Sequence, residues 1–198
     1  MRPKKSIILG FLLFALLAVT IFASCGGNDM RSKKALDNFS KLIDGGDFND
    51  FTLTIYYMSP FTLTRAPLSV DDLVYGITAV NETPREKDDK NGSYEKKIVI
   101  DGSRLEENID LLNQIKNVTL IPVEKKSYIN ARIYYLFETK KDGKIFDVVL
   151  WGGYDENSMF VNEVEVKEND IFYDVLRAFL PEDAVNNLNN YVVGIWPK

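Results

Sequence analysis

The stretch from Ala131 to Trp151 reads ARIYYLFETKKDGKIFDVVLW and predicts a β-hairpin. Two runs rich in β-branched and aromatic residues flank Asp142-Gly143. This dipeptide is typical of two-residue hairpin turns, because both central positions of such a turn need a positive φ. The turn would pair residues whose numbers sum to 285. The resulting pairs are Phe137 with Val148, Tyr135 with Leu150, and Tyr134 with Trp151.

The two faces of this hairpin differ in composition. One face is apolar and predicts the core; it carries Ile133, Tyr135, Phe137, Phe146, Val148 and Leu150. The other face is mixed, and we interpret it as the solvent side; it carries Arg132, Tyr134, Leu136, Glu138, Asp147, Val149 and Trp151. Tyr134 and Trp151 would lie side by side there, with Tyr154 in the loop just beyond. Exposed aromatic residues among polar groups are typical of surfaces that hold proteins or sugars. The alternative is that a helix covers this face.

The rest of the chain supplies further strands and helices. Strands are predicted at 51–58, 94–100, 118–123 and 159–167, and helices at 30–44, 70–75, 103–115 and 170–180, with a short one from 181. Ser103 and Glu106 have the spacing of a capping box at a helix start. Because strands and helices do not alternate regularly, we predict an α+β fold: an antiparallel sheet of about five to six strands with three to four helices packed on it, after an N-terminal signal helix.

The N-terminus has the three zones of an export signal. Arg2, Lys4 and Lys5 supply positive charge, and residues 6–22 are almost entirely apolar. The segment Ile21-Phe22-Ala23-Ser24-Cys25 then resembles the lipobox of bacterial lipoproteins, in which the cysteine thiol receives a diacylglycerol before cleavage. Leu is usual where Phe22 stands. The alternatives are an uncleaved membrane anchor over residues 6–23 and an ordinary secretory signal.

Cys25 is the only cysteine of the chain and therefore has no intramolecular disulfide partner. We expect residues 1–24 to be a signal peptide, 25–33 a lipidated cysteine and flexible tether, and 34–198 a single α+β domain. The expected location is the outer face of the cell membrane, held by lipid on Cys25.

The charge of the mature chain disfavours two classes of partner. The signal removes three of the 24 basic residues and none of the 29 acidic ones, which leaves 21 against 29 and a net charge of −8. This sign argues against nucleic acid and against broad adhesion to anionic lipid.

The residue inventory also restricts the chemistry. The chain has no histidine, so Ser-His-Asp, Cys-His and Cys/His zinc arrangements are excluded. Neither of the common nucleotide-binding glycine motifs is present, and the acidic stretches around Gly92 and Gly143 lack the end residues of a calcium loop. The adjacent acid pairs Asp71-Asp72, Glu106-Glu107 and Asp155-Glu156 point apart on a helix or strand, which disfavours paired acid and base. We predict no catalytic residue, no metal and no cofactor.

The lipobox-like start, and the run through residues 158–166, 171–175 and 179–183, resemble small Gram-positive lipoproteins grouped as a domain of unknown function. The resemblance implies location and architecture but no activity. The sequence therefore favours a non-enzymatic binding or protein-interaction module on the membrane, with a protein or glycan partner. The alternative is a hydrolase of cell-envelope polymers that uses two distant carboxylates.

Overall fold

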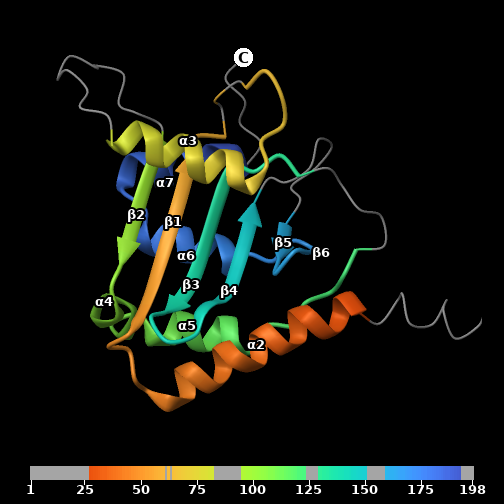
Figure 1. The fold of residues 1–198 in the computed structure, drawn as a ribbon, viewed down its shortest axis with the longest axis vertical. Coiled ribbons are helices and arrows are strands. Elements are labelled where there is room, and N and C mark those ends of the chain that lie inside the picture. Colours follow the sequence, from red (N-terminus) through yellow and green to blue (C-terminus); the bar gives the residue numbers. More distant parts are fainter. Residues whose placement is uncertain are drawn as a thin grey trace, which may run out of the picture.

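A computed structural model describes residues 27–60, 62, 64–82, 95–123, 129–150 and 159–192. It contains an open antiparallel sheet of six strands in the order β2-β1-β3-β4-β5-β6 (Figure 1). The strands are β1 (Phe51–Met58), β2 (Glu95–Ile100), β3 (Ile133–Thr139), β4 (Gly143–Leu150), β5 (Met159–Val161) and β6 (Val164–Val166). The predicted α+β class is confirmed.

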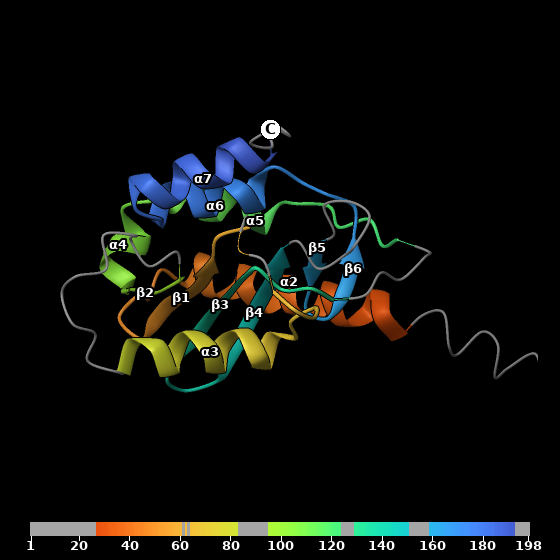
Figure 2. The same cartoon turned by 90° about the horizontal axis from the view of Figure 1, so that it is seen from above.

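The helices lie on both faces and at one end of the sheet. They are α2 (Gly27–Gly45), α3 (Val70–Glu82), α4 (Gly102–Glu106), α5 (Ile109–Lys116), α6 (Ile171–Phe179) and α7 (Glu182–Val192). Helices α5, α6 and α7 pack on one face and α3 on the other, which gives three layers (Figure 2). Helix α2 crosses the end of the sheet where β1 starts (Figure 1). Within the described ranges, none of the helices is both long and apolar enough to span a bilayer.

The main core lies between the sheet and the α5–α7 layer. The six hairpin residues predicted to face the core are all fully buried there, as predicted. Phe39 of α2 fixes this helix on the core, since its ring centroid lies 5.0 Å from that of Phe137, 5.4 Å from that of Phe146 and 6.1 Å from that of Phe51. Packed aromatic rings at these separations restrict both the position and the rotation of α2.

The register of the hairpin differs from the predicted one. Phe137 lies opposite Phe146, Tyr135 opposite Val148 and Tyr134 opposite Val149. The loop is longer than two residues, because Thr139 pairs with Gly143, whose φ is +68°, and the pairing shifts between Phe137 and Glu138. The shift from the predicted pairing is two residues. Because side chains alternate between the faces with period two, a shift of two residues leaves each side chain on its predicted face. The predicted core face is therefore correct although the predicted turn is wrong.

The chain between residues 118 and 167 also corrects the prediction. The single strand expected at 159–167 is a tight hairpin of β5 and β6, whose turn residues Asn162 and Glu163 have φ of 47° and 69°. The strand expected at 118–123 is an irregular segment that makes one bridge, from Pro122 to Val166.

Three helices also differ from expectation. The helix expected over 103–115 is interrupted after Glu106, and its start is capped by Asp101, whose Oδ1 accepts from the Arg104 amide at 3.0 Å. Helix α3 runs for 13 residues where a short turn was expected. Helix α2 begins at Gly27, three residues before the expected helix start and within the segment expected to be a flexible tether.

Candidate binding surface

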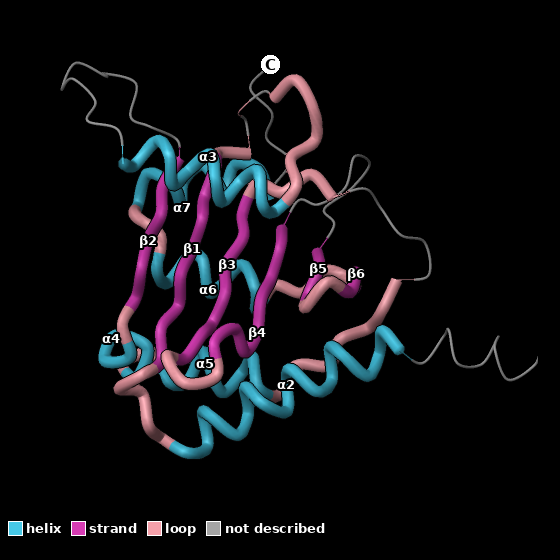
Figure 3. The backbone as a smooth tube through the Cα atoms, in the orientation of Figure 1, coloured by secondary structure: helices cyan, strands magenta, loops and turns pink. Residues whose placement is uncertain are grey.

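Among the described residues, helix covers only part of the α3 side of the sheet. Helix α3 crosses the half of the sheet where β1 ends, and the other half lies open beside it (Figure 3). Cross-strand pairs place Thr54 between Val99 and Leu136, and Leu136 beside Asp147; the next row joins Thr52, Glu138 and Lys144. We define the open sheet surface by its accessible members, which are Thr52, Val99, Leu136, Glu138 and Lys144.

On the open sheet surface Val99 lies on the edge strand β2 and Leu136 on β3, beside the charged side chains of Glu138 and Lys144. Val99 is 60% exposed, and Thr52, Leu136 and Glu138 are half-buried. Lys144 Nζ lies 2.9 Å from Asp147 Oδ2, which fixes this lysine at one margin.

Tyr134, predicted to be an exposed binding residue, is buried. It is 8% exposed and belongs to a second apolar cluster, in which it packs with Leu73 and Ile77 of α3. It also stacks on Tyr56, with ring centroids 6.1 Å apart and planes at 23°. The prediction of exposure is wrong for Tyr134, because α3 is long enough to bring two apolar residues, four positions apart, onto this face.

The other two residues of the predicted binding face, Trp151 and Tyr154, lie outside the described residues, as does Cys25. The predicted neighbour of Tyr134 is replaced by Val149 in the observed register.

A cluster of hydrogen-bonded polar side chains lies at the boundary between the covered and the open half of the sheet. The Tyr134 hydroxyl donates to Asp147 Oδ2 at 3.2 Å, and the Asp147 amide donates to Asn162 Oδ1 at 2.9 Å. Burial, and then the nearby Asp147 carboxylate, raise the pKa of the Tyr134 hydroxyl well above its ordinary value. With Lys144 as its second side-chain partner, Asp147 is a satisfied structural carboxylate.

Three exposed carboxylates of the described part, those of Asp72, Asp101 and Asp183, have structural partners as well. Asp72 Oδ2 accepts from the Ser69 hydroxyl at 2.7 Å, and the Asp72 amide donates back to Ser69 Oγ at 3.1 Å, a reciprocal cap at the start of α3. Hydrogen bonding lowers the pKa of Asp72, through Ser69, and that of Asp101, through the Arg104 amide. The Lys96 ammonium lowers the pKa of Asp183. A general acid needs a raised pKa, so these shifts have the wrong direction for one.

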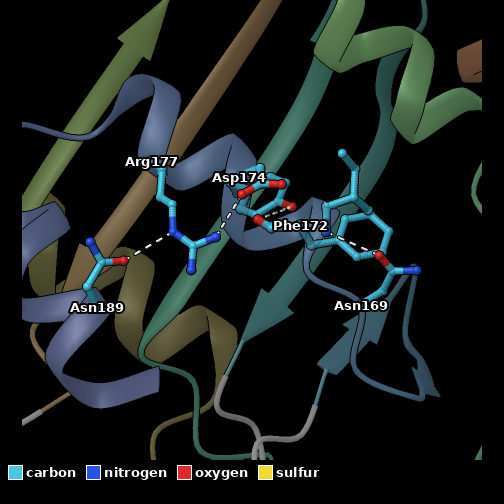
Figure 4. Close-up of polar contacts among 7 residues, drawn as sticks. Asn169, Phe172, Asp174, Arg177 and Asn189 are labelled. Carbon is cyan, nitrogen blue, oxygen red and sulfur yellow. Dashed lines mark hydrogen bonds and ion pairs between the residues drawn. The ribbon is translucent and has the colours of Figure 1, made fainter. Parts of the chain in front are cut away.

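The polar contacts between α6 and α7 serve packing (Figure 4). Arg177 Nη1 donates to Asp174 Oδ1 at 2.7 Å, and Arg177 Nε donates to Asn189 Oδ1 at 3.1 Å, which ties α7 to α6. Asn169 Oδ1 accepts from the Ile171 amide at 3.1 Å and caps α6, as predicted. Across the described ranges, no group of three Cys, Asp or Glu residues is placed to hold a metal ion.

Sequence reasoning missed the open sheet surface because it treated the whole mixed face as one surface. The available signal was the spacing of Leu73 and Ile77, which with Val70 and Val74 gives α3 an apolar side of its own. A helix of that length covers part of a face and leaves the remainder exposed.

No family model, no curated protein and no solved structure matches this chain.

Proposed function

We propose that this chain is a lipoprotein, held by lipid on Cys25 at the outer face of the cell membrane, whose domain binds a protein partner through the open sheet surface. The observation that carries the binding role is the uneven cover of the sheet: helices pack along one face, whereas α3 leaves part of the other face accessible, with Val99 60% exposed. The lipobox-like segment before Cys25 supports the location.

The anchor is tested by mass spectrometry of the membrane fraction. We expect an N-terminal peptide that begins at Cys25 and carries acyl chains, and a Cys25→Ser variant should lack them. Recovery of intact protein that still contains Met1 would overturn the anchor.

The binding role is tested by photocrosslinking from Thr52 in intact cells. We expect a crosslinked partner whose yield falls at least tenfold in a Val99→Asp variant. Ile121→Asp is the matched control, because Ile121 is also an exposed aliphatic residue, at 49%, and lies outside the open sheet surface. Equal loss in both variants, or loss in neither, would show that the open sheet surface is not where the partner binds.

The described carboxyl groups do not support the hydrolase alternative. It requires two carboxyl groups of different pKa across a substrate site, and the shifted carboxyls of the described residues are all lowered by caps or an ion pair.

A further inference from the structure

Helix α2 is attached almost directly to the proposed lipid site. It begins at Gly27, two residues after Cys25. Each helical residue advances about 1.5 Å, so Lys33 and Lys34 lie on the order of 10 Å along the helix from its start. If Cys25 carries the lipid, these lysines are within reach of the headgroups by covalent geometry alone.

The rotation of α2 is fixed by the core. Ala35, Leu36, Phe39, Leu42 and Ile43 pack inward. At 100° per residue the opposite side of the helix presents Lys33, Lys34, Asp37 and Lys41, with Asn38 at its margin, and all five are exposed. Because core packing fixes α2, the helix cannot rotate about its own axis, and its outward side moves only with the whole domain.

The charge of α2 differs from that of the whole chain. By sequence, residues 27–45 of α2 hold four basic residues and three acidic ones, whereas the chain as a whole has 24 basic and 29 acidic. Further along, Asp44 is paired with Lys116 at 2.6 Å. An anionic membrane attracts basic residues near its surface and repels the acidic remainder, so the two effects favour the same orientation.

We propose that the outward side of α2, at Lys33, Lys34 and Lys41, lies against the anionic phospholipid headgroups of the membrane that holds Cys25. This proposal rests on the proposed lipid anchor and adds the orientation of the domain. Tethering makes the contact intramolecular, so a weak attraction is sufficient. The contact would hold α2 against the bilayer and would keep the acidic remainder of the chain away from the bilayer.

The test uses the purified lipidated protein in vesicles with nitroxide-labelled headgroups. A fluorophore is attached at Asn38→Cys, exposed at the margin of the outward side of α2, or at Tyr75→Cys on α3, where Tyr75 is 77% exposed. We expect quenching at position 38 to be at least twofold stronger in vesicles that contain phosphatidylglycerol than in pure phosphatidylcholine. This excess should disappear in 0.5 M salt, and position 75 should show none.

Charge reversal gives the matched control. Lys33→Glu with Lys34→Glu should abolish the excess quenching at position 38. Arg65→Glu with Lys97→Glu makes the same change in total charge at exposed sites elsewhere and should leave the excess in place. If the protein floats with the vesicles but is quenched equally in both lipids, the proposed orientation is overturned and the lipid anchor is not. Protein that does not float with the vesicles would overturn the anchor as well.

Discussion

Gly102 lies where the chain passes another backbone segment too closely for a side chain. A Cβ built on Gly102 would be 1.6 Å from the Phe48 carbonyl oxygen. We expect Gly102→Ala to lower the free energy of unfolding by about 3 kcal/mol or more, because one of the two segments must move. Urea denaturation measures the change.

Gly76 is the control for this substitution. It lies within α3, and a Cβ there would meet nothing within 4 Å. Gly76→Ala should raise stability by about 1 kcal/mol, since Ala is the better helix former. If Gly102→Ala were as stable as the unaltered protein, the close approach to Phe48 would be disproved.

Burial of single residues could be predicted where one rule decides it. Tyr135 and Phe137 lie two positions apart in a strongly β-forming run, on the face that also carries Ile133, and both are buried on the predicted face. Tyr134 could not be placed by that rule, because its burial depends on α3, which is distant in sequence. The role of Gly102 was also hidden, since Asp101-Gly102 is typical of an ordinary turn and the neighbouring Phe48 backbone is known only from the fold.

At the scale of elements, the β5–β6 turn has a substitution that should stabilise it. Asn162 and Glu163 both have positive φ, and the second position of such a turn favours Gly. We expect Glu163→Gly to raise the free energy of unfolding by up to about 1 kcal/mol, because the left-handed conformation is costly for a residue with a Cβ. Glu163→Ala removes the same carboxylate but keeps the Cβ, and thermal denaturation should show no gain for it. A gain in both variants would assign the effect to charge instead of backbone conformation.

Helix α3 is attached through a smaller apolar cluster than the helices of the other face. Leu73 is fully buried against this cluster. Leu73→Ala should cost about 2 to 5 kcal/mol in local stability and speed amide hydrogen exchange in α3 well before exchange rises in β3 and β4. Tyr75→Ala, on the exposed side of the same helix, should leave exchange unchanged. Uniform acceleration throughout the sheet would instead show that α3 unfolds only with the whole domain.

The elements themselves were largely predictable, and their ends were not. The strand at 51–58 and the helix capped by Asn169 follow from local patterns of apolar residues and caps. The Asp142-Gly143 pair favoured a two-residue turn, but a shift in pairing between Phe137 and Glu138 lengthens the loop. Register depends on the total packing of the pair of strands, so a local turn signal alone does not determine it.

At the scale of the molecule, the order of the elements in the sequence predicted the class of fold, but it did not predict which helices cover which face of the sheet. The helices from 102 onward could have covered either face, and only the assembled sheet shows that α5, α6 and α7 share one face. Within the described ranges, α3 is the only helix on the other face (Figure 2). The open sheet surface is a consequence of this unequal division. Its position therefore depends on strand order, which no local pattern in the chain encodes.

Buried tyrosine hydroxyls join the layers and set an alkaline limit for the whole domain. Tyr135 donates to the Phe172 carbonyl at 3.2 Å and connects the sheet to α6, and Tyr57 donates to the Ala184 carbonyl at 3.4 Å and connects it to α7. Burial raises the pKa of Tyr57 to about 12 and raises that of Tyr135 well above its ordinary value. Below pH 10 these groups are neutral in the folded and unfolded chain alike. Above pH 10 only the unfolded chain releases the protons, so stability falls as pH rises.

We therefore expect cooperative unfolding between about pH 10 and 12, to which Tyr57 alone contributes about 2 to 3 kcal/mol. Absorbance of tyrosinate at 295 nm and circular dichroism, followed over the same pH range, should show ionisation of the buried tyrosines together with loss of structure. Tyr57→Phe removes one of the groups that oppose folding at high pH, so its stability should depend less steeply on pH, even though it loses a hydrogen bond at neutral pH. Ionisation of all ten tyrosines near pH 10 with unchanged circular dichroism would contradict the burial that joins the sheet to its helices.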